Sequence, residues 1–167
     1  ISKEVNRNIL GILKSGQYIL GGNVEELEAK FSKFIGSKYS VSCNSGTDAL
    51  VLSLRALNIG HGDEVITTPF TYFATAEAIV LVGAKPIFVD INPHTFNINY
   101  KNIEKYINKR TKAIMPVHIF GQSAEMYEIK RICRKHNLKL IEDCAQSFGA
   151  KKNKKYTGTF GDFGCFS

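Results

Sequence analysis

Small polar residues follow several apolar runs of this chain, and the first such group suits the binding of an anion. In the segment Asn44–Leu50, Gly46 permits a tight turn, and Ser45 and Thr47 carry hydroxyls. If a strand passes into a helix here, the unpaired N–H groups of the first helical turn and the helix dipole form a cradle for phosphate. Ordinary capping of the helix by Ser45 or Thr47 explains the same residues. The segment is neither G-x-G-x-x-G nor a P-loop.

A carboxylate ends another apolar run. Asp143 follows residues 138–141, with Glu142 beside it. Because side chains alternate along a strand, we expect one of these carboxylates to point inward and the other outward. A carboxylate at the mouth of a buried strand needs a cation or hydrogen-bond donors, and a protonated ring nitrogen of a cofactor would satisfy it. Capping of the following turn is the alternative for Asp143.

An aromatic residue occupies a third such place. Tyr72 comes shortly after Pro69 at the end of an apolar run, where its ring can present a face to a flat ligand. Packing in the core beside Phe70 and Phe73 is the alternative. Each signal is weak by itself, but their occurrence in order at successive strand ends favours one ligand site.

The elements that position these residues alternate between strand and helix from residue 38 onward. We predict strands at 38–43, 64–68, 85–90, 112–117 and 139–142, a final strand within 161–167, and helices at 47–57, 72–82, 101–108 and 124–136. Before them we predict a helix over 2–15 and a second helix, capped by Asn23 with Glu26 as its capping-box partner and ended by Gly36. The alternation indicates an α/β fold with a doubly wound, mostly parallel sheet, which binds ligands beyond the carboxyl ends of its strands.

Composition excludes several classes of protein. The 167 residues are 44% hydrophobic with modest glycine and proline, which excludes a collagen-like or disordered chain. No apolar run approaches the roughly 18 residues of a membrane span, so we expect no membrane partner. The net charge is +7, but the basic residues are dispersed without a recognised motif, so we expect no nucleic-acid partner. The four cysteines lack C-x-x-C spacing and the histidines are scattered, which predicts free thiols in a reducing cytoplasm and no metal site.

Together these motifs resemble the sugar-nucleotide aminotransferases of the DegT/StrS group, which are pyridoxal-phosphate enzymes of the aspartate-aminotransferase fold, fold type I. The segments that carry the resemblance follow the family's order and spacing over nearly the whole chain, and they are 16–21, 44–50, 68–78, 82–86, 116–121, 142–150 and 158–167. The resemblance implies that residues 1–36 form an N-terminal helical segment and that 37–167 form part of the large cofactor-binding domain. The C-terminal small domain would be absent.

The resemblance implies pyridoxal phosphate as the cofactor and gives roles to a set of residues: Gly46, Thr47, Asp48, Tyr72, Asp143, Gln146 and Ser167. The first three would hold the phosphate, chiefly through backbone donors, and Ser167 would add a contact. Tyr72 would stack on the pyridine ring, and Asp143 would keep the ring nitrogen protonated. Gln146 would lie near the ring face or its hydroxyl.

The same resemblance implies transfer of an amino group from an amino acid, glutamate in the family, to a nucleotide-linked keto-sugar, with a 3-keto sugar favoured over a 4-keto sugar. It also implies a cytoplasmic homodimer. The family's Schiff-base lysine is expected about five residues beyond Ser167, so no catalytic residue is expected within the chain and we expect it to be an N-terminal fragment. Two alternatives stay open: a catalytically silent fragment or pseudoenzyme, and a related pyridoxal-phosphate sugar dehydratase.

Overall fold

The computed structural model describes residues 2–167, which form two compact units that divide between Ser42 and Cys43. The first unit contains two helices, α1 (Ser2–Ser15) and α2 (Gly22–Ile35), and an extended segment leads from α2 to the second unit. Among the helices of residues 2–167, none is both long enough and apolar enough to cross a bilayer.

The start of α2 differs from the prediction. Its N-cap is Gly21, whose backbone is extended and which makes no side-chain cap bond. Asn23 therefore lies inside the first turn and the predicted capping box is wrong, because Glu26 forms an ion pair with Lys30 at 2.6 Å instead. The predicted end is confirmed, since Gly36 adopts the left-handed conformation (φ 75°) that closes the last turn.

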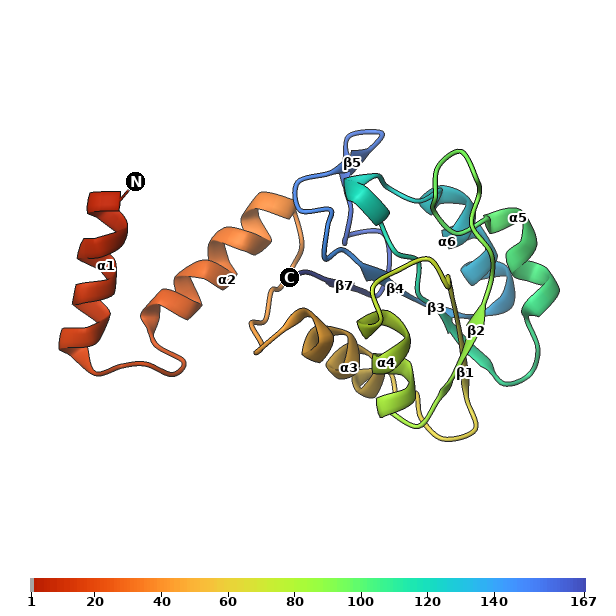
Figure 1. The fold of residues 1–167 in the computed structure, drawn as a ribbon, viewed down its shortest axis with the longest axis horizontal. Helices are drawn as coiled ribbons and strands as arrows, with labels where there is room; N and C mark the ends of the chain where they lie inside the picture. Colours follow the sequence, from red (N-terminus) through yellow and green to blue (C-terminus); the bar gives the residue numbers. More distant parts are fainter. Residues whose placement is uncertain (1) are drawn as a thin grey trace. The chain divides into compact units, whose positions relative to one another are not determined.

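The second unit alternates helices and strands, as the sequence predicts (Figure 1). Its elements in chain order are α3 (Gly46–Ala56), β1 (Glu64–Thr67), α4 (Ala74–Leu81), β2 (Lys85–Phe88), α5 (Tyr100–Ile103), the 3-10 turn η1 (Glu104–Tyr106), β3 (Thr111–Ile114), the 3-10 turn η2 (Ile119–Gly121), α6 (Met126–His136), β4 (Lys139–Asp143), the hairpin strands β5 (Lys151–Lys152) and β6 (Lys155–Tyr156), and β7 (Phe163–Cys165).

The main sheet has five strands in the order β2-β1-β3-β4-β7, and every neighbouring pair is parallel. Helices α3 and α4 cover one face and α5 and α6 the other, which confirms the doubly wound α/β fold (Figure 1). Because all five strands point the same way, the segments that follow them gather at one edge of the sheet. That edge carries the polar groups identified from the sequence.

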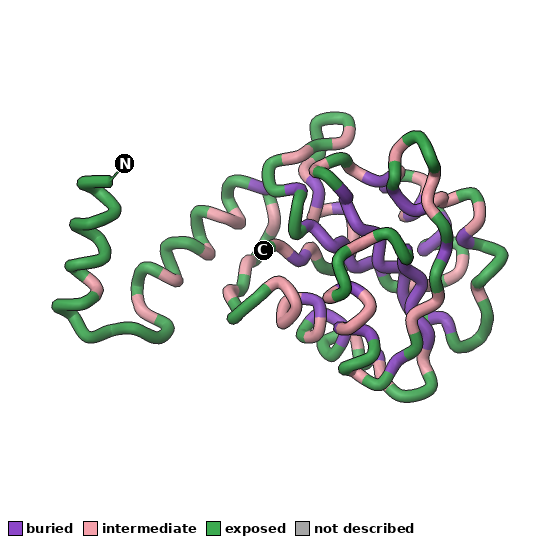
Figure 2. The backbone as a smooth tube through the Cα atoms, viewed as in Figure 1, coloured by how far each residue is buried: buried purple, intermediate pink, exposed green. Residues whose placement is uncertain are grey.

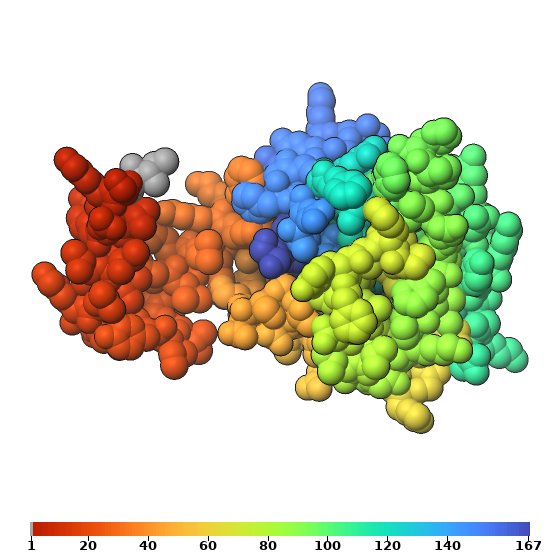
Figure 3. Space-filling view, viewed as in Figure 1, coloured from red at the N-terminus to blue at the C-terminus, as the bar shows by residue number. Residues whose placement is uncertain are grey.

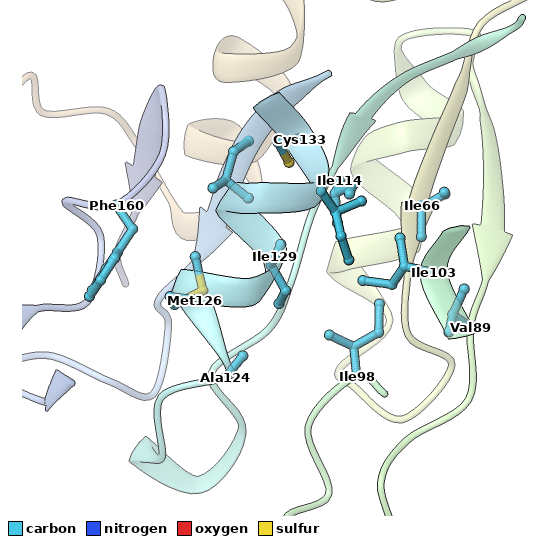
Figure 4. Close-up of a cluster of buried hydrophobic side chains, with 12 residues drawn as sticks. Ile66, Val89, Ile98, Ile103, Ile114, Ala124, Met126, Ile129, Cys133 and Phe160 are labelled. Atoms are coloured by element: carbon cyan, nitrogen blue, oxygen red, sulfur yellow. The ribbon is translucent and has the colours of Figure 1, made fainter. Parts of the chain in front are cut away.

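The core consists of two layers separated by the sheet, and alternate residues of each strand enter opposite layers. Ile66, Ile114 and Leu140 pack under α6, and Figure 4 shows this cluster with Met126 and Ile129 from α6. The layer under α3 and α4 contains Leu50, Leu54, Ile59, Val65, Ala78, Ile79, Ala84, Ala113, Met115, Ile141 and Cys165. Figure 2 shows the buried positions running along the strands of this unit.

The predicted strand at 38–43 is wrong. This segment has no regular secondary structure, and the side chains of Tyr39 and Val41 are 73% and 83% exposed. Its alternating Tyr, Ser and Val residues favour a strand, but a strand also needs a neighbouring edge to supply backbone hydrogen bonds. The segment instead leads from α2 into the turn before α3.

Three helices are shorter than predicted, and one of them is α6, which begins at Met126 and not at residue 124. The helix predicted over 72–82 begins at Ala74, so Tyr72 lies in the loop before α4. The helix predicted over 101–108 forms as a single turn, α5, followed by η1. These differences lie at element ends, where short loops between strand and helix take up the first and last residues of a periodic pattern.

Candidate functional site

The turn before α3 holds a capped helix start. Ser45 is the N-cap: its Oγ accepts from the Asp48 N–H at 3.1 Å and donates to Asp48 Oδ2 at 2.9 Å. The capping alternative is therefore confirmed for Ser45, whose backbone is extended as a cap requires. Asp48 takes part in the cap through both its backbone and its carboxylate.

Capping leaves two donors at the start of α3. Among residues 2–167, no group accepts a hydrogen bond from the backbone N–H of Gly46 or of Thr47. These N–H groups lie at the positive end of the helix dipole, with the Thr47 hydroxyl beside them. The capped turn can therefore still receive an anion.

Ser167 lies directly against this turn. A Cβ atom placed on Gly46 would lie 3.1 Å from Ser167 Oγ and 2.7 Å from Ser167 Cβ, and the second distance is closer than real Cβ atoms approach. Strand β7 brings Ser167 there, because β7 pairs with β4 and sets Cys165 opposite Asp143. Residue 46 must be glycine for the Ser167 hydroxyl to reach the start of α3, and the space-filling view in Figure 3 shows the dark-blue chain end at the surface.

Asp143, the last residue of β4, is 6% exposed and has donors on both oxygens. Its Oδ2 accepts from Thr75 Oγ1 at 2.8 Å, and its Oδ1 accepts from the Ala145 N–H at 3.2 Å. The Ala145 bond is the turn capping that the sequence left open as an alternative. It occupies one oxygen only, and the second oxygen faces α4, where Thr75 lies in the first turn.

Glu142 points to the opposite face of the sheet, as strand alternation predicts, but it is fully buried instead of facing outward. The outward expectation is wrong because β4 is covered on both faces. Glu142 Oε1 accepts from the N–H groups of Phe160 (2.7 Å) and Gly161 (2.9 Å), and its Oε2 accepts from the Gly158 N–H at 2.8 Å. This carboxylate organises the turn that leads into β7.

His118 completes the network around Glu142. The Ala124 N–H donates to His118 Nδ1 at 3.1 Å, so Nε2 carries the ring proton and donates to Glu142 Oε2 at 3.0 Å. The ligand atoms of His118, Glu142 and Cys144 lie within 4.8 Å of one another. Burial raises the pKa of the Cys144 thiol well above its usual value, so the sulfur stays protonated, and hydrogen bonds engage both histidine nitrogens. The hydrogen bonds of His118 and Glu142 therefore hold the turn before β7 in place.

Tyr72 and Gln146 lie on loops at the same edge of the sheet. The Tyr72 side chain is 82% exposed, which shows that packing in the core is the wrong alternative. Gln146 is exposed, and its Oε1 accepts from the Phe120 N–H at 2.9 Å. Phe120 has a left-handed backbone (φ 54°), a conformation uncommon for a non-glycine residue. The Gln146 side chain thus ties the loop after β4 to η2, which follows β3.

The structure joins these predicted residues in two groups. Gly46, Thr47, Asp48 and Ser167 meet at the start of α3, whereas Asp143 lies at the end of the neighbouring strand with Thr75. Sequence reasoning missed Thr75. Its position three residues after Tyr72, in the first turn of a helix that follows a strand, was the available signal.

Comparisons with known proteins agree with this geometry. Residues 1–167 match the model of the DegT/DnrJ/EryC1/StrS aminotransferase family. The chain is 49% identical over 164 residues to the UDP-N-acetyl-3-dehydro-alpha-D-glucosamine 3-aminotransferase of Acidithiobacillus ferrooxidans, covering 98% of the chain and 44% of that protein. It is 47% identical over 167 residues to the UDP-2-acetamido-2-deoxy-3-oxo-D-glucuronate aminotransferase of Pseudomonas aeruginosa, covering 100% of the chain and 46% of the relative. The chain thus spans about half the length of the curated relatives it matches.

Solved structures give the same result. A DegT/DnrJ/EryC1/StrS aminotransferase from Brucella abortus superposes with a TM-score of 0.97 at 39% identity, over 100% of this chain and 47% of that one. NtdA from Bacillus subtilis, solved with bound cofactor PMP, superposes with a TM-score of 0.89 at 36% identity, over 94% of this chain and 36% of its own.

Proposed function

Because the chain belongs to the DegT/DnrJ/EryC1/StrS aminotransferase family, we propose that the whole protein uses pyridoxal phosphate to transfer an amino group from an amino acid to a nucleotide-linked keto-sugar. Glutamate is the proposed donor, and a sugar ketone at position 3 is favoured over one at position 4. Two relatives whose names specify a 3-keto or 3-dehydro sugar support this order.

The residues present suit the phosphate, the ring nitrogen and the ring face of the cofactor. The N–H groups of Gly46 and Thr47, with the hydroxyl of Ser167, offer donors to a phosphate, and a Cβ on residue 46 would fill the place that glycine leaves open. The buried Asp143 carboxylate suits a protonated ring nitrogen. The exposed ring of Tyr72 can stack on the cofactor's face.

The observation that carries the proposal is the pairing of β4 with β7. It sets Cys165 opposite Asp143 and so brings the phosphate donors and the buried carboxylate to adjacent strand ends. When bound, the cofactor supplies an electron sink for the carbanion formed at the amino-acid carbon. Asp143 would support that role by keeping the ring nitrogen protonated, and the start of α3 would fix the phosphate end.

The test is cofactor binding and turnover by the complete gene product. We expect pyridoxal phosphate to bind, Asp143→Ala to abolish amino transfer, and UDP-linked 3-keto sugar with glutamate to give an amino sugar detectable by mass spectrometry.

A lysine codon about five positions after that of Ser167 would support the transferase. An early stop codon would support the silent remnant, and a histidine codon the dehydratase. Failure of the purified protein to bind the cofactor would contradict the proposal.

We also propose a homodimer in the cytoplasm. Helix α4 exposes two adjacent apolar residues, Val80 and Leu81, at 59% and 57%, which we assign to the proposed dimer contact. The four cysteines are free thiols, which supports a reducing compartment. Light scattering on the complete gene product checks the dimer, and fractionation of cells checks the compartment.

A further inference from the structure

Two threonine hydroxyls approach Asp143 in a line from the α4 side. Thr75 Oγ1 donates to Asp143 Oδ2 at 2.8 Å, and Thr71 Oγ1 lies 2.9 Å from Thr75 Oγ1. A threonine hydroxyl carries one proton, and the proton of Thr75 is committed to the carboxylate. Thr71 is therefore the donor in the second bond, and the hydrogen bonds run from Thr71 to Thr75 to Asp143.

The acceptor distinguishes Thr75 from Thr67, another fully buried threonine of this region. Thr67 is also 0% exposed, but its hydroxyl donates to a neutral backbone carbonyl, that of Met115, at 2.8 Å. Thr75, 0% exposed, donates to a carboxylate at the candidate site. A hydrogen bond to a charged acceptor is about twice as strong as one to a neutral acceptor, and it stabilises the anion relative to the acid.

The same threonine anchors the loop that carries Tyr72. The Thr75 N–H donates to the Tyr72 carbonyl at 3.2 Å, while Thr71 precedes Tyr72 in the chain and contacts the Thr75 hydroxyl. The two threonines thus lie on either side of Tyr72 and connect its loop to Asp143.

We propose that Thr75 is a positioning residue that holds Asp143 as the anionic partner of the cofactor's ring nitrogen, with Thr71 as its own donor. The inference rests on the proposed function, because it takes Asp143 as that partner. Removal of the Thr75 hydroxyl destabilises the carboxylate, so the proton between the ring nitrogen and Asp143 moves from nitrogen toward oxygen. No other group gains or loses a proton in this step.

The test uses the complete gene product loaded with pyridoxal phosphate that carries 15N in the ring. We expect Thr75→Val to move the 15N resonance from the protonated toward the unprotonated position and to weaken cofactor binding about tenfold. Thr75→Ser, which keeps the hydroxyl, should retain the wild-type resonance and affinity. Thr71→Val, at a half-buried position, should move the resonance in the same direction by less.

Thr67→Val is the matched control, because it removes an equally buried hydroxyl that does not contact Asp143. It should lower the unfolding temperature yet leave the resonance and the cofactor affinity unchanged. The proposal is overturned if Thr75→Val leaves the resonance in place, if Thr67→Val moves it equally, or if Thr75→Ser moves it as far as Thr75→Val. Should Thr75→Val fail to fold, an unchanged resonance in Thr71→Val overturns it.

Wild-type protein and the variant Asp143→Ala together separate this inference from the proposed function. Failure to bind the cofactor, or a ring nitrogen that stays protonated in Asp143→Ala, overturns both. A protonated nitrogen that depends on Asp143 but does not respond to Thr75→Val overturns this inference alone.

Discussion

Gly46 and Ser167 are in contact at the start of α3, and the contact exists only because residue 46 has no side chain. A Cβ atom there would lie 2.7 Å from the Ser167 Cβ, so either Ser167 or the turn would have to move. The last residue of the chain thereby joins the first turn of α3 in a single anion-binding surface.

Gly46→Ala should therefore disrupt binding of the cofactor phosphate. We expect the dissociation constant for pyridoxal phosphate to rise about tenfold or more, from loss of hydrogen bonds to a charged group. Pyridoxal, which lacks the phosphate, should lose much less affinity. Equilibrium dialysis with both compounds measures the difference.

Two further variants test that explanation. Ser167→Gly in the Gly46→Ala background should recover part of the affinity by removing the clash. Gly11→Ala, where an added Cβ meets no atom within 4 Å, should change neither dissociation constant. Equal losses for pyridoxal and its phosphate in Gly46→Ala would argue against a phosphate cradle.

Glu142→Gln should destabilise the second unit, although Glu142 itself makes none of the proposed cofactor contacts. An amide has one acceptor atom where the carboxylate has two, and its NH2 group would meet backbone donors from the turn before β7. We expect the free energy of unfolding to fall by about 3 kcal/mol, measured by urea denaturation. Glu128→Gln, which removes an exposed ion pair with Arg131, should change it by less than about 1 kcal/mol. Equal effects of the two variants would be inconsistent with a stabilising role of Glu142 in the turn before β7.

Acid should weaken the contact between η1 and the end of α6. The hydrogen bond from Lys135, and to a smaller extent that from His136, lowers the pKa of Glu104 from 4.5 to about 2. A carboxylate whose pKa is lower in the folded state stabilises that state above its unfolded pKa. The contribution should be complete above pH 4.5 and disappear as the pH falls toward 2.

The unfolding midpoints of wild type and Glu104→Gln, followed from pH 6 down, check this. The two midpoints should differ near pH 6 and converge as the pH falls toward 2. Added salt should reduce the difference because the ion pair is exposed. A difference that stays constant with pH would show that Glu104 does not titrate in this window.

The cysteines should differ sharply in reactivity. Burial raises the pKa of Cys133 and of Cys165 to about 12, and that of Cys144 well above its usual value, whereas Cys43 is exposed. We expect iodoacetamide near pH 8 to modify Cys43 first, as peptide mass mapping would reveal. In Cys43→Ser, the three buried cysteines should stay unmodified until the protein unfolds. Early labelling of Cys165 would contradict the packing of β7.

The sequence predicts the second unit well because parallel strands buried on both faces contain short apolar runs. In residues 64–67 and 139–143 the apolar signal is a pair of adjacent residues, Val65-Ile66 and Leu140-Ile141, and polar groups at or just after the end of each strand meet at the sheet edge. The local sequence pattern does not predict secondary structure correctly where contacts with other parts of the chain determine it. Residues 38–43 have strand-forming residues but no edge to pair with, and Asn23 lies two residues after Gly21, the N-cap of α2.

The candidate site was predictable in part for a related reason. Alternation along β4 predicts that Glu142 and Asp143 point to opposite faces, and they do. It cannot show that three N–H groups from a distant turn surround Glu142, or that Thr75 reaches Asp143, because both depend on packing between elements far apart in the chain.

The adjacency of Glu142 and Asp143 has a consequence for the proposed cofactor site. One peptide unit joins the carboxylate that gathers the turn before β7 to the carboxylate proposed to hold the ring nitrogen. This turn leads directly into β7, which pairs with β4 and places Ser167 at the start of α3. The proposed phosphate site therefore depends on a carboxylate buried on the opposite face of the sheet, and we expect retention of the cofactor to fall when the contacts of Glu142 are lost.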